Sequence, residues 1–136
     1  MASNKSITLL NEIEGDFYVN TDFNMMFTVI RNIIINAIKF TPEKGTVTVS
    51  CKTDLKIKNN IVICIADTGV GMSKKRITQI LEESSVVSKN GTNGESGLGL
   101  GLQFSKMFIK LLKGEMRIES IEGKGTNFLI SLPKDK

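Results

Sequence analysis

The sequence predicts an α+β fold of two layers, in which one mixed, mostly antiparallel sheet of about five strands is covered on one face by about three helices. Two observations predict this fold. Strand-like runs stand before, between and after helix-like runs, in a mixed order. The longest helix-like segment gathers its apolar residues on one side, as expected of a helix that packs on a sheet. The 136 residues suffice for a single domain, expected to span 1–136 with an ordered core at about 7–132.

The first elements are two short strands and a long helix. The strands are predicted over residues 7–11 and 17–20, on either side of a Gly-Asp turn. Thr21 or Asp22 then offers the side-chain oxygen that caps a helix, so a helix is predicted over residues 22–40. A Thr-Pro pair ends it, because the residue before a proline disfavours the helical conformation.

This long helix has two different sides. At about 100° per residue its apolar side chains fall in one arc of roughly 140°. The arc consists of Phe23, Met26, Phe27, Ile30, Ile33, Ile34, Ala37 and Ile38. Nearly opposite its middle, Asn32 and Asn36 are four residues apart and lie one above the other. Lys39 is beside them, and Phe40 is about 40° further round. The helix is therefore expected to bury one side and to present two carboxamides, an ammonium group and a ring on the other.

Two strands are predicted after the helix. Residues 46–52 alternate between apolar and polar side chains, which indicates a strand with one buried and one wetter face. Its apolar side consists of Val47, Val49 and Cys51. A polar turn at 56–60, in which Asn59 and Asn60 suit a hairpin, leads to the next strand. Residues 60–67, NIVICIAD, are apolar on both faces and rich in β-branched side chains, which predicts a central strand.

The remaining elements are two helices and two strands. A short helix is predicted over 74–81, and a second long helix over 98–112. Between them, 84–97 is rich in Gly, Ser and Asn and too long for a plain connection, so we expect a disordered or functional loop. Strands are predicted over 115–120 and 126–132, around a glycine-containing turn.

The composition excludes several classes of function. The chain contains no histidine, which excludes serine-triad catalysis and histidine-based metal sites. The net charge is +4, but the lysines are spread along the chain, so nucleic-acid binding is not predicted. No apolar run approaches the roughly 20 residues of a membrane span, and the N-terminus lacks the apolar region of a signal peptide. Cys51 and Cys64 are predicted as buried thiols, without a disulfide or a metal.

Three glycine clusters follow the long helix. The first, DTGVGM from Asp67, comes at the end of the central strand, where a carboxylate can accept from an exocyclic amine and glycines let a flat ring approach the backbone. The second, GLGLGL from Gly97, joins the long loop to a helix, whose backbone amides are suited to a phosphate. The third, GKGT from Gly123, enters the last strand as a turn. A P-loop, a Rossmann fingerprint and the HRD and DFG motifs of protein kinases are all absent from the sequence.

These motifs together resemble a known family. The order NIIINAIKFTP, DTGVGM, GLGLGL and GKGT resembles the N, G1, G2 and G3 boxes of the catalytic, ATP-binding domain of sensor histidine kinases. That domain shares the Bergerat fold with gyrase B, the chaperone of ninety kilodaltons and MutL. The resemblance extends from about residue 7 to residue 132. It implies the same two-layer fold and an ATP site, with a lid at about 83–97.

The resemblance also implies roles for individual residues. In the N box, Asn36 is similar to the asparagine whose oxygen holds Mg²⁺, and Asn32 to the polar residue near the phosphates and the metal. Lys39 is similar to the phosphate-contacting lysine, which completes the implied catalytic set, and Phe40 to the ring beside adenine. Asp67 is similar to the acceptor for the adenine amino group. The other implied nucleotide contacts are Gly69, Gly71 and Met72 around the base, Gly97, Leu98, Gly99, Leu100 and Gly101 at the lid hinge and phosphates, and Thr126 beside adenine.

The implied activity is transfer of the γ-phosphate of Mg·ATP to a histidine on a separate helical hairpin domain, in two-component signalling. The implied partners are that hairpin domain of the same parent protein and, through it, a response regulator. The domain is expected to be monomeric and cytoplasmic, within a homodimeric parent anchored in the inner membrane. Because the chain has no histidine, it cannot phosphorylate itself on one.

Three alternatives remain open at this point. The first is an ATP-hydrolysing clamp like gyrase B, although such relatives carry a water-activating glutamate where this chain has Asn32. The second is a serine kinase of the anti-sigma type, against which the KFTP ending of the N box favours the histidine-kinase branch. The third is a nucleotide-binding module without catalysis. The segment 80–85 also lacks the phenylalanines that the family often has before the lid, so the docking of the lid is open.

Overall fold

The computed structural model describes residues 6–13, 15, 22–82 and 100–134. Within these residues it contains a five-stranded sheet in the order β1-β2-β3-β5-β4 and three helices. The pair β1 and β2 is parallel, and the other neighbours are antiparallel. The elements are β1 (Thr8–Asn11), α2 (Phe23–Lys39), β2 (Thr46–Thr53), β3 (Asn60–Asp67), α3 (Lys74–Glu82), α4 (Leu100–Leu111), β4 (Glu115–Ile121) and β5 (Gly125–Pro133). The predicted two-layer α+β fold is confirmed.

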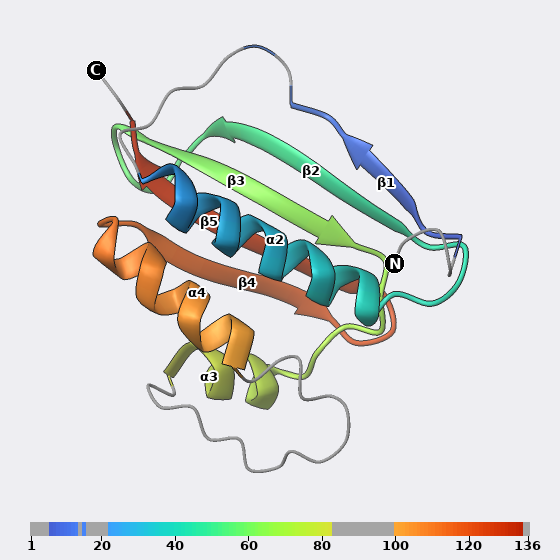
Figure 1. Ribbon diagram of the computed structural model, residues 1–136. Helices are drawn as coiled ribbons and strands as arrows, with labels where there is room; N and C mark the ends of the chain where they lie inside the picture. Colours follow the sequence, from blue (N-terminus) through green and yellow to red (C-terminus); the bar gives the residue numbers. More distant parts are fainter. Residues whose placement is uncertain (1–5, 14, 16–21, 83–99, 135–136) are drawn as a thin grey trace.

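The helices lie on one side of the sheet. Figure 1 shows α2 and α4 side by side along the same face, with α3 near one end of the molecule. The predicted element order is confirmed over the described residues, with boundaries shifted by one or two positions. The strand predicted over 17–20 and the loop at 84–97 lie outside the described residues, as does the first part of the helix predicted from residue 98.

Helix α2 begins and ends where the local chemistry requires. Of the two candidate caps, Asp22 has the role: its Oδ1 accepts a hydrogen bond from the amide of Met25 at 3.0 Å. At the other end the hydroxyl of Thr41 donates to the carbonyl of Ala37 at 2.6 Å, just before the proline. The helix is therefore fixed at both ends by short polar side chains.

The predicted buried side of α2 is partly wrong. Phe23 and Phe27 are 75% and 58% exposed, although both were placed in the apolar arc. Val29 is fully buried instead, and Asn36 is 5% exposed. The buried side of α2, which faces the sheet and α4, is rotated by roughly 80° from the middle of the apolar arc. The two phenylalanine rings stack on each other, with centroids 6.2 Å apart, which removes part of their surface from water without burial in the core.

The core lies between α2, α4 and the facing side of the sheet. Val29 and Ile33 of α2 and Leu102 and Ile109 of α4 are at most 1% exposed. From the sheet they are met by Val47, Ile65, Phe128, Ile130 and Leu132. Burial of each such side chain contributes about 1.5–3 kcal/mol, so this contact surface holds the helices on the sheet.

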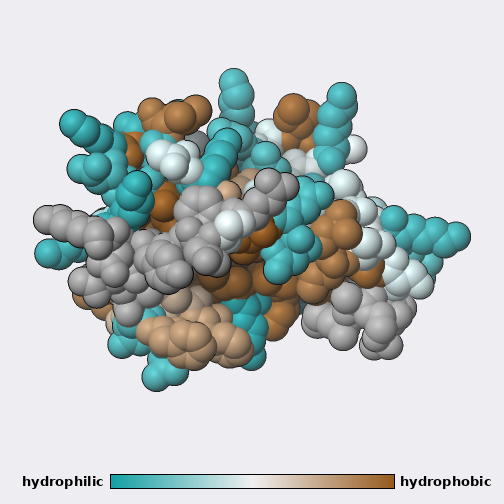
Figure 2. Space-filling model, turned by 90° about the horizontal axis from the view of Figure 1, so that it is seen from above, coloured by the Kyte–Doolittle hydropathy of each residue, from teal (hydrophilic) through white to brown (hydrophobic). Residues whose placement is uncertain are grey.

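Some apolar surface remains outside this core. Leu9 and Leu10 of β1 are 51% and 39% exposed, because β1 is an edge strand. Figure 2, which looks at the molecule from above, shows hydrophobic side chains in patches among hydrophilic ones. Cys51 and Cys64 are free, as predicted, but half-buried rather than buried. Cys64 points to the face of the sheet opposite to that of Ile63 and Ile65, and no described helix packs on this face. Burial raises the pKa of both thiols. None of the described helices combines the length and the apolar character of a membrane span.

A buried polar cluster is centred on Asp54, at the end of the sheet where β2 ends. Asp54, directly after β2, is 5% exposed, and both of its carboxylate oxygens accept from Nη2 of Arg117 at 3.1 Å. The hydroxyl of Ser131 and the amide of Lys56 also donate to it, and Asn60 donates to Ser131 at 2.9 Å. Burial raises the pKa of Asp54, but the bonds from Ser131, Lys56 and Arg117 outweigh it and lower the pKa to about 2. The cluster ties the β2–β3 turn to β4 and β5.

This cluster predicts a pH-dependent stability. A carboxyl group with a folded pKa of about 2 and an ordinary value of 3.8 stabilises the fold above about pH 4 and loses this contribution as the pH falls toward 2. The unfolding free energy of the wild type should exceed that of Asp54→Asn at pH 6, and the difference should shrink by about 1 kcal/mol at pH 3. Urea unfolding of both proteins at the two pH values measures this, because all other carboxyl groups are common to them. A difference that stays constant would show that Asp54 has an ordinary pKa.

Candidate functional site

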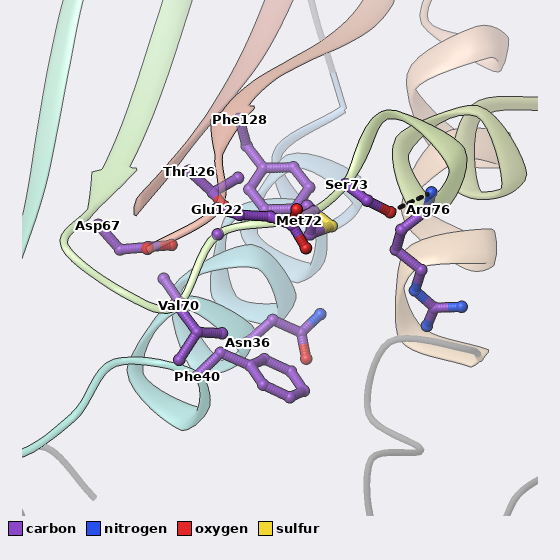
Figure 3. Close-up of a pocket in the computed structure, with 12 residues that line it drawn as sticks. Asn36, Phe40, Asp67, Val70, Met72, Ser73, Arg76, Glu122, Thr126 and Phe128 are labelled. Carbon is purple, nitrogen blue, oxygen red and sulfur yellow. Dashed lines mark hydrogen bonds between the residues drawn. The ribbon is translucent and has the colours of Figure 1, made fainter. Parts of the chain in front are cut away.

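A cavity of about 310 Å³ opens at one end of the sheet. It lies between the last turn of α2, the segment after β3, the start of α3 and the β4–β5 hairpin, as Figure 3 shows. Its size is at the lower end of the range for small-molecule sites. The lining residues are Asn36, Ala37, Phe40, Asp67, Val70, Gly71, Met72, Ser73, Arg76, Glu122, Thr126 and Phe128.

Most of the wall surface is apolar, although half of the twelve lining residues are polar. Ala37 and Phe40 come from α2, Val70 and Met72 from the segment after β3, and Phe128 from β5. Such a cavity accepts a flat ring system and excludes water from its faces. The polar groups that interrupt these walls therefore determine which ring is recognised.

Asp67 is a partly buried acceptor at the cavity wall. It is the last residue of β3 and the direct register partner of Thr126 on β5, so strand pairing brings two lining residues together. Its Oδ1 accepts from the amide of Gly69 at 2.8 Å. Burial raises the pKa of Asp67, and hydrogen bonds from the backbone amides of Gly69 and Thr126 oppose this increase. The turn thus holds a partly desolvated carboxylate at the cavity wall, where it can accept from a ligand N–H group.

The segment after β3 is fixed against the β4–β5 hairpin. The amide of Gly123 donates to the carbonyl of Val70 at 2.7 Å, and the amide of Met72 donates to Ser120 Oγ at 2.8 Å. Between these bonds, Gly71 has φ +76°, and a Cβ at this position would lie 2.1 Å from the carbonyl oxygen of Ile121. Only glycine allows both the backbone conformation and this close approach. The wall of the cavity is therefore a rigid turn.

Asn36 brings a carboxamide to the same cavity from α2. It is 5% exposed, in a position that the sequence pattern placed on the solvent side. Asn32 and Lys39, predicted to act beside it, do not line the cavity. Asn32 faces the start of α4 instead, where a Cβ on Gly101 would lie 3.8 Å from its Cγ. The N-box side chains are therefore divided between the cavity and the α2–α4 contact.

Six of the predicted nucleotide-binding residues line the cavity together. These are Asn36, Phe40, Asp67, Gly71, Met72 and Thr126. Gly69 lies behind the wall as the hydrogen-bond partner of Asp67, and Leu100 begins α4. Gly97, Leu98 and Gly99 lie outside the described residues.

Sequence reasoning missed the other half of the lining. Ala37, Val70, Ser73, Arg76, Glu122 and Phe128 also line the cavity. Two of them had a signal in the sequence: Val70 stands inside the DTGVGM motif, and Phe128 is two residues after Thr126 on the same face of a strand. Ser73 begins α3 by accepting from the amide of Arg76 at 3.1 Å, and nothing in a glycine motif marks this turn as part of the site.

The lining fits an adenine nucleotide with a metal held mainly by its phosphates. Apolar walls and the Asp67 acceptor suit a purine with an exocyclic amine. The carboxamide oxygen of Asn36 is one hard ligand of the kind that Mg²⁺ prefers. Within the described residues, no group of three acidic or cysteine side chains is arranged to hold a metal ion without help. A magnesium ion there would need phosphate oxygens and water for its remaining ligands.

Comparison with known proteins agrees with this geometry. Residues 21–136 match the family model described as "Histidine kinase-, DNA gyrase B-, and HSP90-like ATPase". The chain belongs to this ATPase family. Membership implies ATP binding, in agreement with the predicted cofactor. The resemblance seen in the four boxes is therefore confirmed.

Similar curated proteins carry the names of sensor proteins. The chain is 36% identical over 120 residues to "Sensor histidine kinase WalK" of Bacillus subtilis (strain 168), an alignment that covers 88% of the chain and 20% of WalK. It is 33% identical over 113 residues to "Sensor protein SrrB" of Staphylococcus aureus (strain NCTC 8325 / PS 47), covering 83% of the chain and 19% of SrrB. The chain thus spans about a fifth of the length of these relatives.

Solved structures of two other proteins share the fold. The catalytic domain of histidine kinase ThkA superposes with a TM-score of 0.77 at 22% identity, covering 98% of the chain and 84% of that domain. Full-length ShkA in complex with AMPPNP superposes with a TM-score of 0.80 at 22% identity, covering 99% of the chain and 27% of ShkA. At this identity the likeness concerns the fold alone.

Proposed function

We propose that this domain binds Mg·ATP in the cavity and donates the γ-phosphate to a histidine on a separate helical hairpin domain. The observation that carries the proposal is the convergence of Asn36 and Asp67, from α2 and β3, on one apolar-walled cavity. The similarity to the protein named sensor histidine kinase WalK supports phosphotransfer over other reactions of the family.

Different lining residues would contact different parts of the nucleotide. Asp67 accepts from the adenine amino group, Thr126 lies beside it, and Met72 and Phe40 pack on the ring, while Gly69 and Gly71 shape the turn that brings Asp67 and Met72 to the base. The carboxamide oxygen of Asn36 would hold the magnesium ion. That ion would supply charge neutralisation at the phosphates. Lys39, Gly97, Leu98, Gly99, Leu100 and Gly101 are proposed on the phosphate side, and Asn32 beside them.

The residues of this chain position the reactants and leave the nucleophile to the partner. In the transfer, a ring nitrogen of the acceptor histidine bonds to the γ-phosphorus while the bond to the bridging oxygen breaks and ADP leaves. The chain contains no histidine, so it cannot act as its own acceptor of this kind. Catalysis by positioning and charge neutralisation is consistent with a cavity to which the described residues bring the carboxamide of Asn36 and no histidine.

The hydrolysing clamp is the weaker alternative. A water-activating base would have to stand at Asn32, whose carboxamide accepts no proton at neutral pH. The lack of a base at this position disfavours efficient hydrolysis by the domain alone.

The wider setting is also a proposal. We place the domain in a longer homodimeric sensor protein that carries the histidine-bearing hairpin, passes phosphate to a response regulator and is anchored in the inner membrane. The greater length of the matched relatives is consistent with further domains.

The proposal predicts a clear dependence on the partner domain. With radiolabelled ATP and magnesium, the lone domain should release phosphate at close to the background rate. Addition of the parent's hairpin domain should produce acid-labile, base-stable phosphohistidine, at a rate that rises with hairpin concentration. Asn36→Ala should lose this reaction and the magnesium dependence of ATP binding, because it removes the only proposed protein ligand of the metal.

Two controls make this assay decisive. A hairpin in which the acceptor histidine is replaced by alanine should receive no label. Calorimetric titration of Asn36→Ala with ADP, without metal, should show that the base site is intact. Rapid phosphate release by the lone domain, lost in Asn36→Ala, would instead assign the chain to the hydrolysing clamps.

A further inference from the structure

One basic side chain lines the cavity without a role in the scheme above. Arg76, in the first turn of α3, is the only lysine or arginine among the described lining residues. In Figure 3 it stands at the opposite end of the view from Asp67, with Asn36 and Phe40 between them. Its guanidinium extends away from α3, beyond Ser73. The cavity therefore has an acceptor at one end and a permanent cation at the other.

The described structure gives Arg76 no structural partner. The ion pairs among the described residues belong to Arg117, which binds Asp54 and Glu115 at the other end of the sheet. The backbone amide of Arg76 is used by the Ser73 cap, and its side chain is exposed. Neither burial nor pairing within the fold explains an arginine at this position.

Helix stability does not explain it either. Lys74, Lys75 and Arg76 are consecutive in the first turn of α3, and no acidic residue accompanies them. The positive end of a helix disfavours cations by a few tenths of a kcal/mol each. The basic turn therefore weakens α3 slightly, which is expected where an anion binds beside it.

The charges around the cavity also require a cation. Asp67 and Glu122 both bring carboxylates to the lining and repel a polyphosphate. Lys39, which the resemblance assigns to the phosphates, does not line the cavity. Arg76 is the lining residue that can offset this negative charge.

We infer that Arg76 binds the phosphate groups of the nucleotide at the end of the cavity opposite Asp67. This inference rests on the proposed nucleotide site and adds a contact outside the four boxes. A guanidinium can donate two parallel N–H bonds to one phosphate, and it remains charged at every physiological pH. The phosphate chain would then lie between Arg76 on α3 and Asn36 on α2.

The test compares two single charge removals in adjacent positions. Arg76→Gln and Lys75→Gln each remove one positive charge from the same exposed turn, but Lys75 does not line the cavity. In calorimetric titrations without metal, Arg76→Gln should bind ADP and ATP about tenfold more weakly than wild type. Lys75→Gln should stay within about twofold, because an exposed charge that touches no ligand is screened. Arg76→Lys should fall between them, since it keeps the charge and loses the fork.

The affinity for adenosine, measured in competition with ADP, distinguishes a lost phosphate contact from a change in the shape of the cavity, because adenosine has no phosphate. Its affinity should be equal in wild type and Arg76→Gln. An equal loss for adenosine and ADP, equal losses in the two glutamine variants, or no loss in Arg76→Gln would each overturn the inference. A wild-type domain that binds neither ADP nor ATP would refute the proposed function instead. Thermal unfolding of each variant verifies that it is folded.

Discussion

Replacing Asp67 by alanine should lower the affinity of the domain for ADP by about 100-fold. The partly buried carboxylate is the proposed acceptor for the adenine amino group, and a hydrogen bond to a charged group in such a setting is worth about 1.5–3 kcal/mol. The wild type should also prefer ATP to GTP, because guanine presents a carbonyl oxygen where adenine presents the amine. Calorimetric titration with ADP, ATP and GTP measures both effects.

The matched control for Asp67→Ala is Glu122→Gln, which removes the other carboxylate that lines the cavity. Because Glu122 is exposed, its replacement should change ADP affinity by less than about threefold. Asp67→Asn keeps an oxygen for the amide of Gly69, so it separates loss of the ligand contact from loss of the turn. Equal affinity of the wild type for ATP and GTP would disprove this role of Asp67.

Gly71→Ala should reduce the free energy of unfolding by about 3 kcal/mol. The added Cβ would meet the carbonyl oxygen of Ile121 at 2.1 Å, and the residue would also have to keep a φ of +76°. The backbone of two segments must then separate, which breaks the bonds that hold the cavity wall. Urea unfolding of the two proteins gives the difference directly.

Gly123→Ala is the control that isolates this contact. Gly123 has a similar φ of +83°, but a Cβ there meets no atom within 4 Å. Its replacement should therefore reduce the free energy of unfolding by only about 1 kcal/mol, because alanine disfavours this backbone conformation. If both variants lost the same stability, the close approach to Ile121 would contribute nothing and the turn would be adaptable.

The sequence predicted the elements well because their signals are local. The apolar run of β3 and the alternation of β2 identified both strands. The rotation of α2 was not predictable in the same way. Hydrophobicity alone favoured the side with Phe23 and Phe27, whereas the side with Val29 is the buried one. The two rings contact each other instead. A periodic pattern gives the apolar arc of a helix but not the part of it that the sheet will cover.

The site could be predicted as far as the glycine boxes reached. They identified Asp67, Met72 and Thr126, although only the pairing of β3 with β5 makes Asp67 and Thr126 neighbours. Arg76 and Glu122 stand in segments without a motif. They reach the cavity because the segment between β3 and α3 packs against the β4–β5 hairpin, which a local sequence pattern does not show.

The prediction that Asn32, Asn36 and Lys39 lie together on one side of α2 did not separate the residue that lines the cavity from the two that do not. Relative to Asn36, Asn32 and Lys39 point about 40° and 60° further from the sheet side of α2. Asn36 therefore lies at the border of the buried side and reaches the cavity, while the other two do not line it. A prediction from one helix could not place this border, because it depends on where the sheet ends.

The pairing of β3 with β5 also determines when the site can exist during folding. The hairpins β2–β3 and β4–β5 join segments close in sequence, whereas the β3–β5 seam joins residues 60–67 to 126–133 across α3 and α4. Local pairs form faster than distant ones, so this seam is expected to close late. Asp67 and Thr126 face each other across it, and a nucleotide that contacts both can bind only the closed state. A ligand that binds only the closed state shifts the equilibrium away from any opened form. Occupancy of the cavity would therefore stabilise the pairing of β3 with β5.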